Sequence, residues 1–182
     1  MNSKLSSTDV QRLMSNPSAD IRVETAEKIA GEFNARSLNE SERHIAEDIF
    51  RHLIKDAEVR VREALSAQLK SCPDVPHDVA ATLAKDVDSV ALPILRFSEV
   101  LSDDDLIEIL QNQEPEKQIA IAQRRSLSTA VSGAVIDTNN DTAVARLVAN
   151  EGAALDGEAF ERLMDQYGDD EAVAGVITRR QL

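Results

Sequence analysis

Three side chains on one predicted helix have a spacing that could hold a metal ion. His44, Asp48 and His52 are four residues apart, so they follow one face of a helix predicted over residues 41–54. Imidazole and carboxylate groups are common zinc ligands. This face lies opposite an apolar stripe that includes Ile49, it carries other charged side chains, and no group is evident that would orient the histidines. We interpret it as a solvated helix surface and predict no metal site and no cofactor.

The chain has no evident nucleophile or phosphate-binding loop. Cys72 is its only cysteine, has no histidine nearby in sequence and precedes Pro73, so nothing lowers the thiol pKa as nucleophilic chemistry requires. His77 lies near a predicted helix start and is interpreted as structural. The six glycines form neither a phosphate-binding loop nor a dinucleotide-binding pattern. We therefore predict that the chain has no catalytic residue and is not an enzyme.

An acidic run resembles a cation site at first sight. Asp103, Asp104 and Asp105 are consecutive, however, and consecutive side chains on a helix point about 100° apart. Ser102 precedes them, which predicts a helix with an N-terminal cap and acids in its first turn, where the helix dipole favours them. The same three carboxylates are also candidates for contacting a basic partner.

Five arginines are further candidates for contacting a partner. Three occur at the starts of repeated segments, near Asp20, Asp56 and Glu58, and an adjacent pair ends a later segment in the acidic half of the chain. One interpretation is a ladder of arginine–carboxylate contacts between helix pairs, with the adjacent pair compensating a helix dipole. The alternative is a row of guanidinium groups that bind a partner's carboxylates. The five residues are Arg22, Arg60, Arg62, Arg124 and Arg125.

The segments that carry these arginines repeat along the chain. The stretch DIRVETAEKIAG at 20–31 has the same pattern as EVRVREALSAQL at 58–69, at an offset of 38 residues between Ile21 and Val59. Alternation of valine and arginine at 59–62 is typical of a strand, but Val61, Leu65 and Leu69 share one face of a helix. The repeat favours the helix.

Weaker copies extend the repeat to the end of the chain. Their marker residues predict helices of an irregular period, and the segments between them supply partner helices at 41–54, 77–85, 126–136 and 157–167, together with the one that Ser102 caps. Pro93 is expected in a first helical turn, and Gly152 and Gly168 at left-handed helix ends. We predict one domain over residues 1–182 with a joint near 72–76. The markers are Ile21, Val59, Val90, Ile119, Val144 and Val173.

Composition and charge limit the class of partner. The net charge is −13, and residues 73–182 hold 9 Lys and Arg against 21 Asp and Glu. Such a surface repels phosphate backbones and favours basic protein partners. No apolar run approaches the length of a membrane span, and the N-terminus lacks a signal-peptide pattern. We expect a cytoplasmic protein that binds neither nucleic acid nor membranes.

Two resemblances follow from these segments. The pattern of Asp56, Val61-Arg62, Ala64, Leu65 and Leu69 looks like the second helix of HEAT repeats. The series from about Leu92 to Arg180, which includes PILRFS at 93–98, LSDDDLIEIL at 101–110 and QIAIAQRRSLSTAVSGAVI at 118–136, resembles the bacterial family called domain of unknown function 2336. Its pattern has proline after the double arginine, where this chain has Ser126 and Gln181. The repeated segments predict an all-α solenoid of about six helix pairs. The resemblance implies that this solenoid is a HEAT-like superhelix, and it implies no established activity or cofactor.

We expect the chain to be a non-catalytic adaptor or scaffold that binds another protein or peptide, with a basic helix or tail as one candidate partner and a regulatory role as a further option. The alternative is an enzyme on a HEAT-like scaffold such as a DNA glycosylase, which the acidity and the 3% aromatic content disfavour. The chain ends directly after a repeat helix with no evident closing element, so we expect a further helical region beyond Leu182. The oligomeric state is left open.

Overall fold

The segment whose alternation imitates a strand is helical from Val59 onward. Val61, Leu65 and Leu69 are fully buried along one side of this helix, while Arg60 is exposed. The computed structural model describes residues 5, 7–15, 18–112 and 114–180, and all regular elements in these ranges are helices. The all-α prediction is therefore confirmed.

Contacts within the chain divide it into two units, residues 1–101 and 102–182. The helices of the first unit are α1 (Ser7–Met14), α2 (Ala19–Asn34), α3 (Glu40–Leu53), α4 (Val59–Leu69), α5 (His77–Ala84) and α6 (Asp88–Phe97). Those of the second are α7 (Asp103–Gln111), α8 (Pro115–Ala122), α9 (Thr129–Asp137), α10 (Asp141–Ala149), α11 (Gly157–Tyr167) and α12 (Glu171–Arg180). The segment 72–76 connects α4 to α5 inside the first unit, and a single domain stays a prediction.

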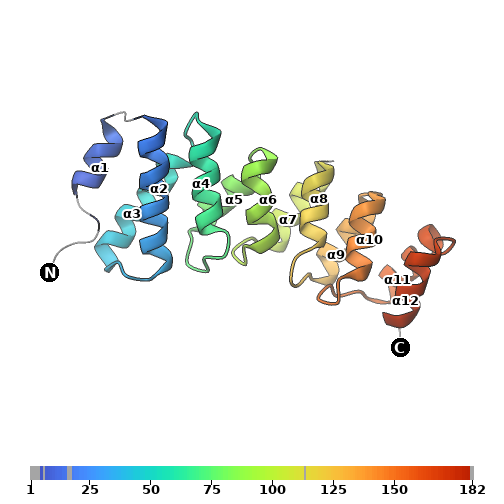
Figure 1. The fold of residues 1–182 in the computed structure, drawn as a ribbon. Coiled ribbons are helices and arrows are strands. Elements are labelled where there is room, and N and C mark those ends of the chain that lie inside the picture. Colours follow the sequence, from blue (N-terminus) through green and yellow to red (C-terminus); the bar gives the residue numbers. More distant parts are fainter. Residues whose placement is uncertain (1–4, 6, 16–17, 113, 181–182) are drawn as a thin grey trace. The chain divides into compact units, whose positions relative to one another are not determined.

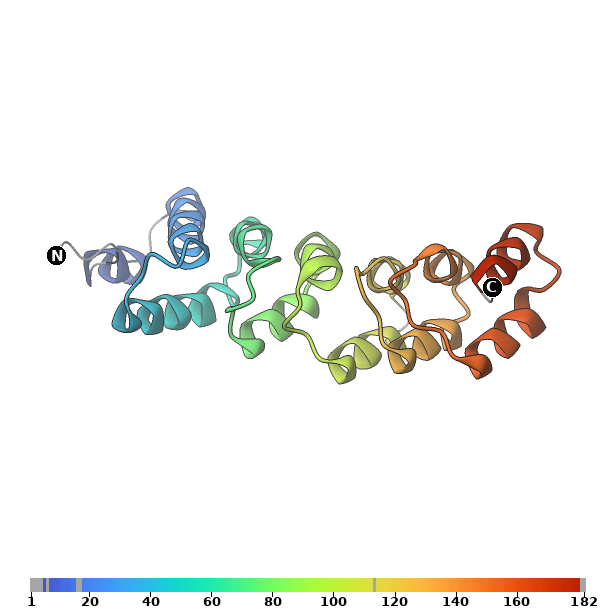
Figure 2. The same ribbon diagram turned by 90° about the horizontal axis from the view of Figure 1, so that it is seen from below.

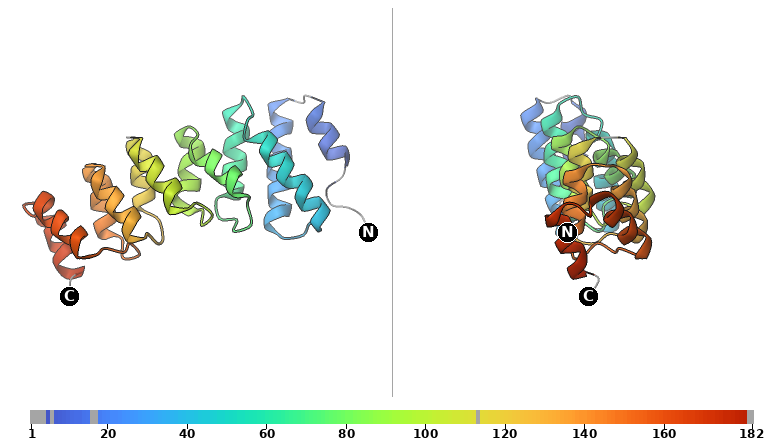
Figure 3. Two further views of the ribbon diagram at one scale, coloured as in Figure 1. Left: turned by 180° about the vertical axis from the view of Figure 1, so that it is seen from behind. Right: turned by 90° about the vertical axis from the view of Figure 1, so that its right-hand side faces the viewer.

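Within each unit, the helices form two layers. In the first unit α2 packs on α4 and α4 on α6, side by side in Figure 1, while α3 and α5 lie in the other layer, as Figure 2 shows from below. In the second unit α8, α10 and α12 form one layer and α7, α9 and α11 the other; the views in Figure 3 show the same arrangement. Stacked helix pairs share a core that no pair could bury alone. The predicted helical repeat is confirmed.

The register of the repeat differs from the predicted offset of 38. When α2 and α4 are aligned at their first helical residues, Ile21 corresponds to Val61 and Arg22 to Arg62, an offset of 40. The amino-acid sequences of the two segments match best at an offset of 38. The buried positions, however, correspond when the two helices are aligned at their first residues, at an offset of 40. Val59 is 37% exposed while Val61 is completely buried.

Three local predictions were wrong. Pro93 is the sixth residue of α6, not in its first turn, because the helix begins earlier, at Asp88. Gly168 ends α11 with φ of −63°, and among the described residues no glycine has a positive φ, so neither it nor Gly152 forms a left-handed end. The left-handed positions belong to Arg36 and Asn139, both with φ of 52°.

Gly152 is required for a close contact between two loops of the second unit. A Cβ added there would lie 1.9 Å from the carbonyl oxygen of Arg125. The approach aligns the loops so that Leu127 N–H donates to Gly152 O at 3.1 Å and Ala154 N–H donates to Leu127 O at 2.9 Å. Asn150 adds side-chain hydrogen bonds to the carbonyl oxygens of Ala122 and Arg124, at 2.9 and 2.7 Å. These bonds join the end of α8 to the end of α10.

Gly152→Ala is expected to lower the free energy of unfolding by about 2 kcal/mol, because the loops must separate to admit the methyl group. Gly175→Ala is the matched control: no atom lies within 4 Å of an added Cβ in α12. This change is expected to stabilise the helix by about 0.5–1 kcal/mol. Urea unfolding followed by circular dichroism measures both, and equal stability of the two variants would contradict the close contact.

Candidate interaction surfaces

The arginine at the fourth position of α2 holds the entry of α4. Arg22 Nε donates to Asp56 Oδ2 at 2.6 Å and Nη2 donates to Oδ1 at 3.0 Å, in a two-point contact that is mostly buried. Asp56 Oδ1 also accepts the backbone N–H of Glu58, just before α4 begins. A planar guanidinium and a carboxylate match in this geometry, which makes the contact strong and directional. The predicted Arg–Asp link between helix pairs is therefore present.

The fourth residue of α4 repeats the contact one step further along the unit. Arg62 Nε and Nη2 donate to the Asp86 carboxylate at 2.6 and 2.9 Å, just ahead of α6. Its Nη1 donates to the backbone oxygen of Asp56 at 2.6 Å. Asp56 thus accepts from Arg22 through its carboxylate and from Arg62 through its carbonyl. The two links join α2, α4 and α6 in series.

Arg60 differs from these two arginines in exposure. Its Nη1 lies 2.5 Å from Asp20 Oδ1, but the side chains are 52% and 80% exposed. An ion pair in water contributes little and is readily exchanged. The ladder interpretation is confirmed for Arg22 and Arg62, and among the three arginines Arg60 is the most accessible to a partner's carboxylate. Such a role stays a prediction.

The double arginines of the second unit have divided roles. Arg180 donates to the carbonyl oxygens of Leu147 and Val148 at 3.3 and 3.2 Å, which satisfies acceptors at the C-terminal end of α10, and to Ala153 O in the loop that follows, at 2.5 Å. Arg124 occupies the corresponding tenth position counted from the start of α8 and is only 9% exposed. Arg125 and Ser126, which follow it, are exposed. Gln181 lies outside the described residues.

The predicted cap of α7 is confirmed. Ser102 Oγ accepts the N–H of Asp105 at 3.2 Å, and Asp105 Oδ2 accepts the N–H of Ser102 at 2.8 Å, a reciprocal capping box. Asp105 is thereby committed to the helix. Asp103 and Asp104 are exposed beside it, so these two remain candidates for a partner.

The exposed surface of the second unit is much more acidic than its composition alone requires. Fourteen of the 16 Asp and Glu residues between 102 and 182 are exposed, but only three of the seven Lys and Arg residues are: Arg125, Arg146 and Arg179. Lys117 is buried at 3% exposure with its Nζ 2.6 Å from Glu114, and Arg124 and Arg180 are withdrawn as described above. Four of the seven cations are therefore withdrawn from solvent, whereas nearly all the acids face it.

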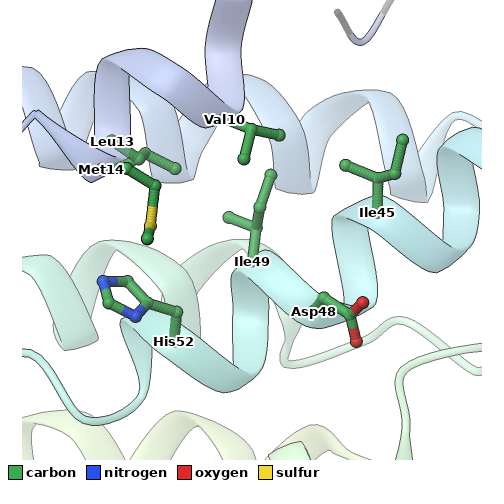
Figure 4. A pocket seen from close by; sticks show the side chains of 7 residues that line it. All are labelled: Val10, Leu13, Met14, Ile45, Asp48, Ile49 and His52. Atoms are coloured by element: carbon green, nitrogen blue, oxygen red, sulfur yellow. The ribbon is translucent and has the colours of Figure 1, made fainter. Parts of the chain in front are cut away.

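A pocket in the first unit contains two of the three residues with metal-like spacing. It has a volume of about 360 Å³ between α1 and α3, and Figure 4 shows Asp48 and His52 in the same lining as Ile49 and Met14. Asp48 and His52 are exposed, as a solvated helix surface requires, but the prediction that they lie opposite the apolar stripe was wrong, because they border the same pocket as Ile49. His44 is highly exposed near Glu47, at 3.9 Å. In the described ranges, no three metal-binding side chains are grouped.

Cys72 is buried between α4 and α5. Burial raises the pKa of its thiol above the ordinary value, and the backbone hydrogen bonds near Asp74 and Val75 only partly oppose this. A protonated, buried thiol is a poor nucleophile. Within the part of the chain that is described, no helix is both long and apolar enough to cross a membrane.

Two layers of stacked helix pairs define an α-helical repeat protein. Its family is "Uncharacterised protein conserved in bacteria (DUF2336)", whose model matches residues 90–182, and the chain belongs to it. The matched region begins within α6 and covers the second unit, and the resemblance is confirmed. None of the curated proteins and none of the solved structures matches the chain.

Arg62→Met is expected to lower the free energy of unfolding by about 1.5–3 kcal/mol, because it removes charge-assisted hydrogen bonds and leaves the largely buried Asp86 carboxylate without this partner. Arg60→Met tests the same chemistry at an exposed pair and should change stability by less than about 0.5 kcal/mol. Urea unfolding curves of both variants provide the comparison. A loss of the same size for both would show that burial does not separate the two contacts.

Acid should weaken the first unit through Asp56. Burial alone would raise the pKa of this carboxyl, but the hydrogen bonds from Arg22 and the Glu58 N–H outweigh burial and hold the pKa below its ordinary value. The stabilisation is therefore complete above about pH 4, the pKa range of a free aspartate, and is lost as pH falls through the folded-state pKa.

Asp56→Asn should be less stable than the wild type at neutral pH, and the difference should shrink below about pH 4. Denaturant midpoints measured across this range provide the test. Asp20→Asn, at a carboxylate that is 80% exposed, is the control and should change the stability at neutral pH by less than about 0.5 kcal/mol. A constant difference for Asp56→Asn would refute the link to protonation.

Proposed function

We propose that the chain is a non-catalytic adaptor of the bacterial cytoplasm that binds a basic protein or peptide through its second unit. The observation that carries the proposal is the division of charge there: fourteen acids face solvent and most cations are withdrawn. Stacked helix pairs offer broad, regular surfaces to a partner. Complementary charge steers the encounter and selects against acidic partners.

The arrangement of reactive groups supports an adaptor over an enzyme. The Cys72 thiol is buried with a raised pKa, and the arginines that could have recognised a substrate anion at Arg22 and Arg62 are held by Asp56 and Asp86. The acidic exposed surface opposes nucleic acid, whose binding depends on neutralising phosphates with Lys and Arg. A glycosylase on this scaffold is correspondingly disfavoured.

Capture from native cytoplasm with Asp103→Asn/Asp104→Asn tests the proposal and leaves the Ser102–Asp105 capping box in place. Glu24→Gln/Glu27→Gln removes two exposed charges from the first unit and is the matched control. We expect basic proteins, identified by mass spectrometry, to be recovered at low salt and released as salt shortens the Debye length to about 3 Å near 1 M. Recovery should fall for the Asp103/Asp104 variant and not for the control.

Recovery that ignores salt, or recovery of proteins without basic character, would count against the adaptor proposal. Equal recovery by the wild type and both variants would exclude Asp103 and Asp104 as contacts. The affinity of a purified captured partner, measured for the three forms, then fixes the size of the effect.

A further inference from the structure

The last residue of α6 is an exposed aromatic side chain that two cations share. Phe97 is 45% exposed. Lys70, directly after α4, has its Nζ 5.1 Å from the centroid of the Phe97 ring, and Arg96 has its guanidinium carbon 5.3 Å from the same centroid. These are distances of cation–π contacts. We call the ring and the two cations the Phe97 surface.

The two cations of the Phe97 surface have no carboxylate to offset their charge. Among the described residues, neither Lys70 nor Arg96 forms an ion pair, and Glu99, exposed in the following loop, pairs with neither. Their distances to the ring place them within about 10 Å of each other, about one Debye length at 0.1 M salt, so they repel. Five other arginines of the first unit do pair with aspartates: Arg22, Arg36, Arg51, Arg60 and Arg62.

The position of the two cations has a structural reason, but the exposure of the ring does not follow from it. Both cations lie at helix C-termini, where the helix dipole favours positive charge. That role requires no aromatic partner. At Phe33, where Arg43 lies 4.5 Å from the ring centroid, the ring is completely buried and packs edge-on against Phe50. The Phe97 ring has the same kind of cation contact but is open to solvent.

The Phe97 surface lies between two neighbouring helices inside the first unit. Lys70 follows α4 and Phe97 ends α6, and these helices pack on each other, side by side in Figure 1. The ring therefore lies on the side of α6 that faces α4. A helix added to either end of the chain would leave this position unchanged, because α4 and α6 are already neighbours.

We propose that the Phe97 surface binds an acidic segment of a partner protein, one in which an apolar side chain lies beside Asp or Glu residues. The apolar side chain packs on the ring, and the carboxylates bind Lys70 and Arg96, which relieves the repulsion between these cations. Arginine accepts a carboxylate at two points and lysine at one. The inference does not rest on the proposed function, which assigns a basic partner to the second unit.

A single-stranded nucleic acid is the poorer occupant of this surface. Bases stack on aromatic rings and phosphates bind Lys and Arg, so the local chemistry is related. The chain, however, has a net charge of −13, which repels a phosphate backbone, whereas a short acidic segment brings far fewer charges.

The probe is a rhodamine-labelled peptide of about 12 residues, up to about 40 Å long when extended, with Leu and Phe set among Asp and Glu. A second peptide has Asn and Gln at every Asp and Glu position. The third probe is a labelled single-stranded oligonucleotide. Fluorescence anisotropy measures each against the 182-residue chain. We expect the acidic peptide to bind at low salt, and the neutral peptide and the oligonucleotide not to bind.

A variant of the ring and a matched control test the apolar contact. Phe97→Ala should raise the Kd of the acidic peptide by about fivefold or more, because it removes the aromatic contact. Val87→Ala, at a side chain 49% exposed at the opposite end of α6, should leave the Kd unchanged. Circular dichroism should show equal helix content in both variants.

Variants of the cations test the carboxylate contact. Lys70→Gln and Arg96→Gln should each raise the Kd by about threefold at low salt and by less at high salt. Lys55→Gln, at an exposed lysine ahead of α4, is the matched control and should change the Kd little.

Equal binding of the acidic peptide to the wild type and to Phe97→Ala would overturn the site, as would binding of both peptides alike or of neither. Binding of the oligonucleotide that Phe97→Ala abolishes would identify nucleic acid as the occupant and refute the acidic segment. A salt-sensitive dimer in sedimentation, lost in Phe97→Ala, would identify a second copy instead. None of these results depends on Asp103 and Asp104, so the proposal for the second unit is tested separately.

Discussion

The two-point contact between an arginine and an aspartate at the entry of the next helix is the interaction on which the first unit depends. Helices α4 and α6 have 11 and 10 residues, lengths that are marginal for isolated helices in water. Arg22 and Arg62 fix where the following helix starts, since Asp56 and Asp86 also accept the first N–H groups ahead of α4 and α6. Apolar burial between α2, α4 and α6 then acts on helices whose register is already set. The arginine–aspartate contacts determine how the helices are positioned, and the burial of aliphatic side chains contributes most of the free energy that stabilises the fold.

The second unit reaches the same stacking with neutral acceptors. Asn150 and Arg180 donate to backbone carbonyl oxygens at the ends of α8 and α10, and Gln118 donates to Leu110 O while it accepts from Asn140. These links consume few carboxylates, so nearly all acids remain at the surface. Structure and charge are connected in this way: the unit that joins its helices through carbonyl groups is the one with the strongly acidic exterior.

Helix type and approximate position were predictable from the sequence. Apolar residues at spacings of three and four indicate a helix for α3 and α11, and the repeat of the α2 pattern resolved the strand-like alternation at the start of α4. The register was not predictable. The sequence around Arg60 matches the sequence around Arg22, but the arginine that binds the aspartate ahead of the next helix is Arg62. Arg60 and Arg62 differ in their burial, which the sequence alone does not show. The exposure of Met164 was not predictable either, because its spacing is ordinary for a helix and exposure depends on the neighbours of α11.

The burial of Lys117 has a practical side. It is the one lysine beyond residue 101, whereas Lys28, Lys55 and Lys85 are exposed in the first unit. Reagents or enzymes that acylate amines therefore modify lysines of the first unit and leave Lys117, the lysine of the second unit, unmodified. A complex formed on the second unit would escape amine-to-amine cross-linking, whereas carbodiimide coupling of its carboxylates to a partner's lysines would record it.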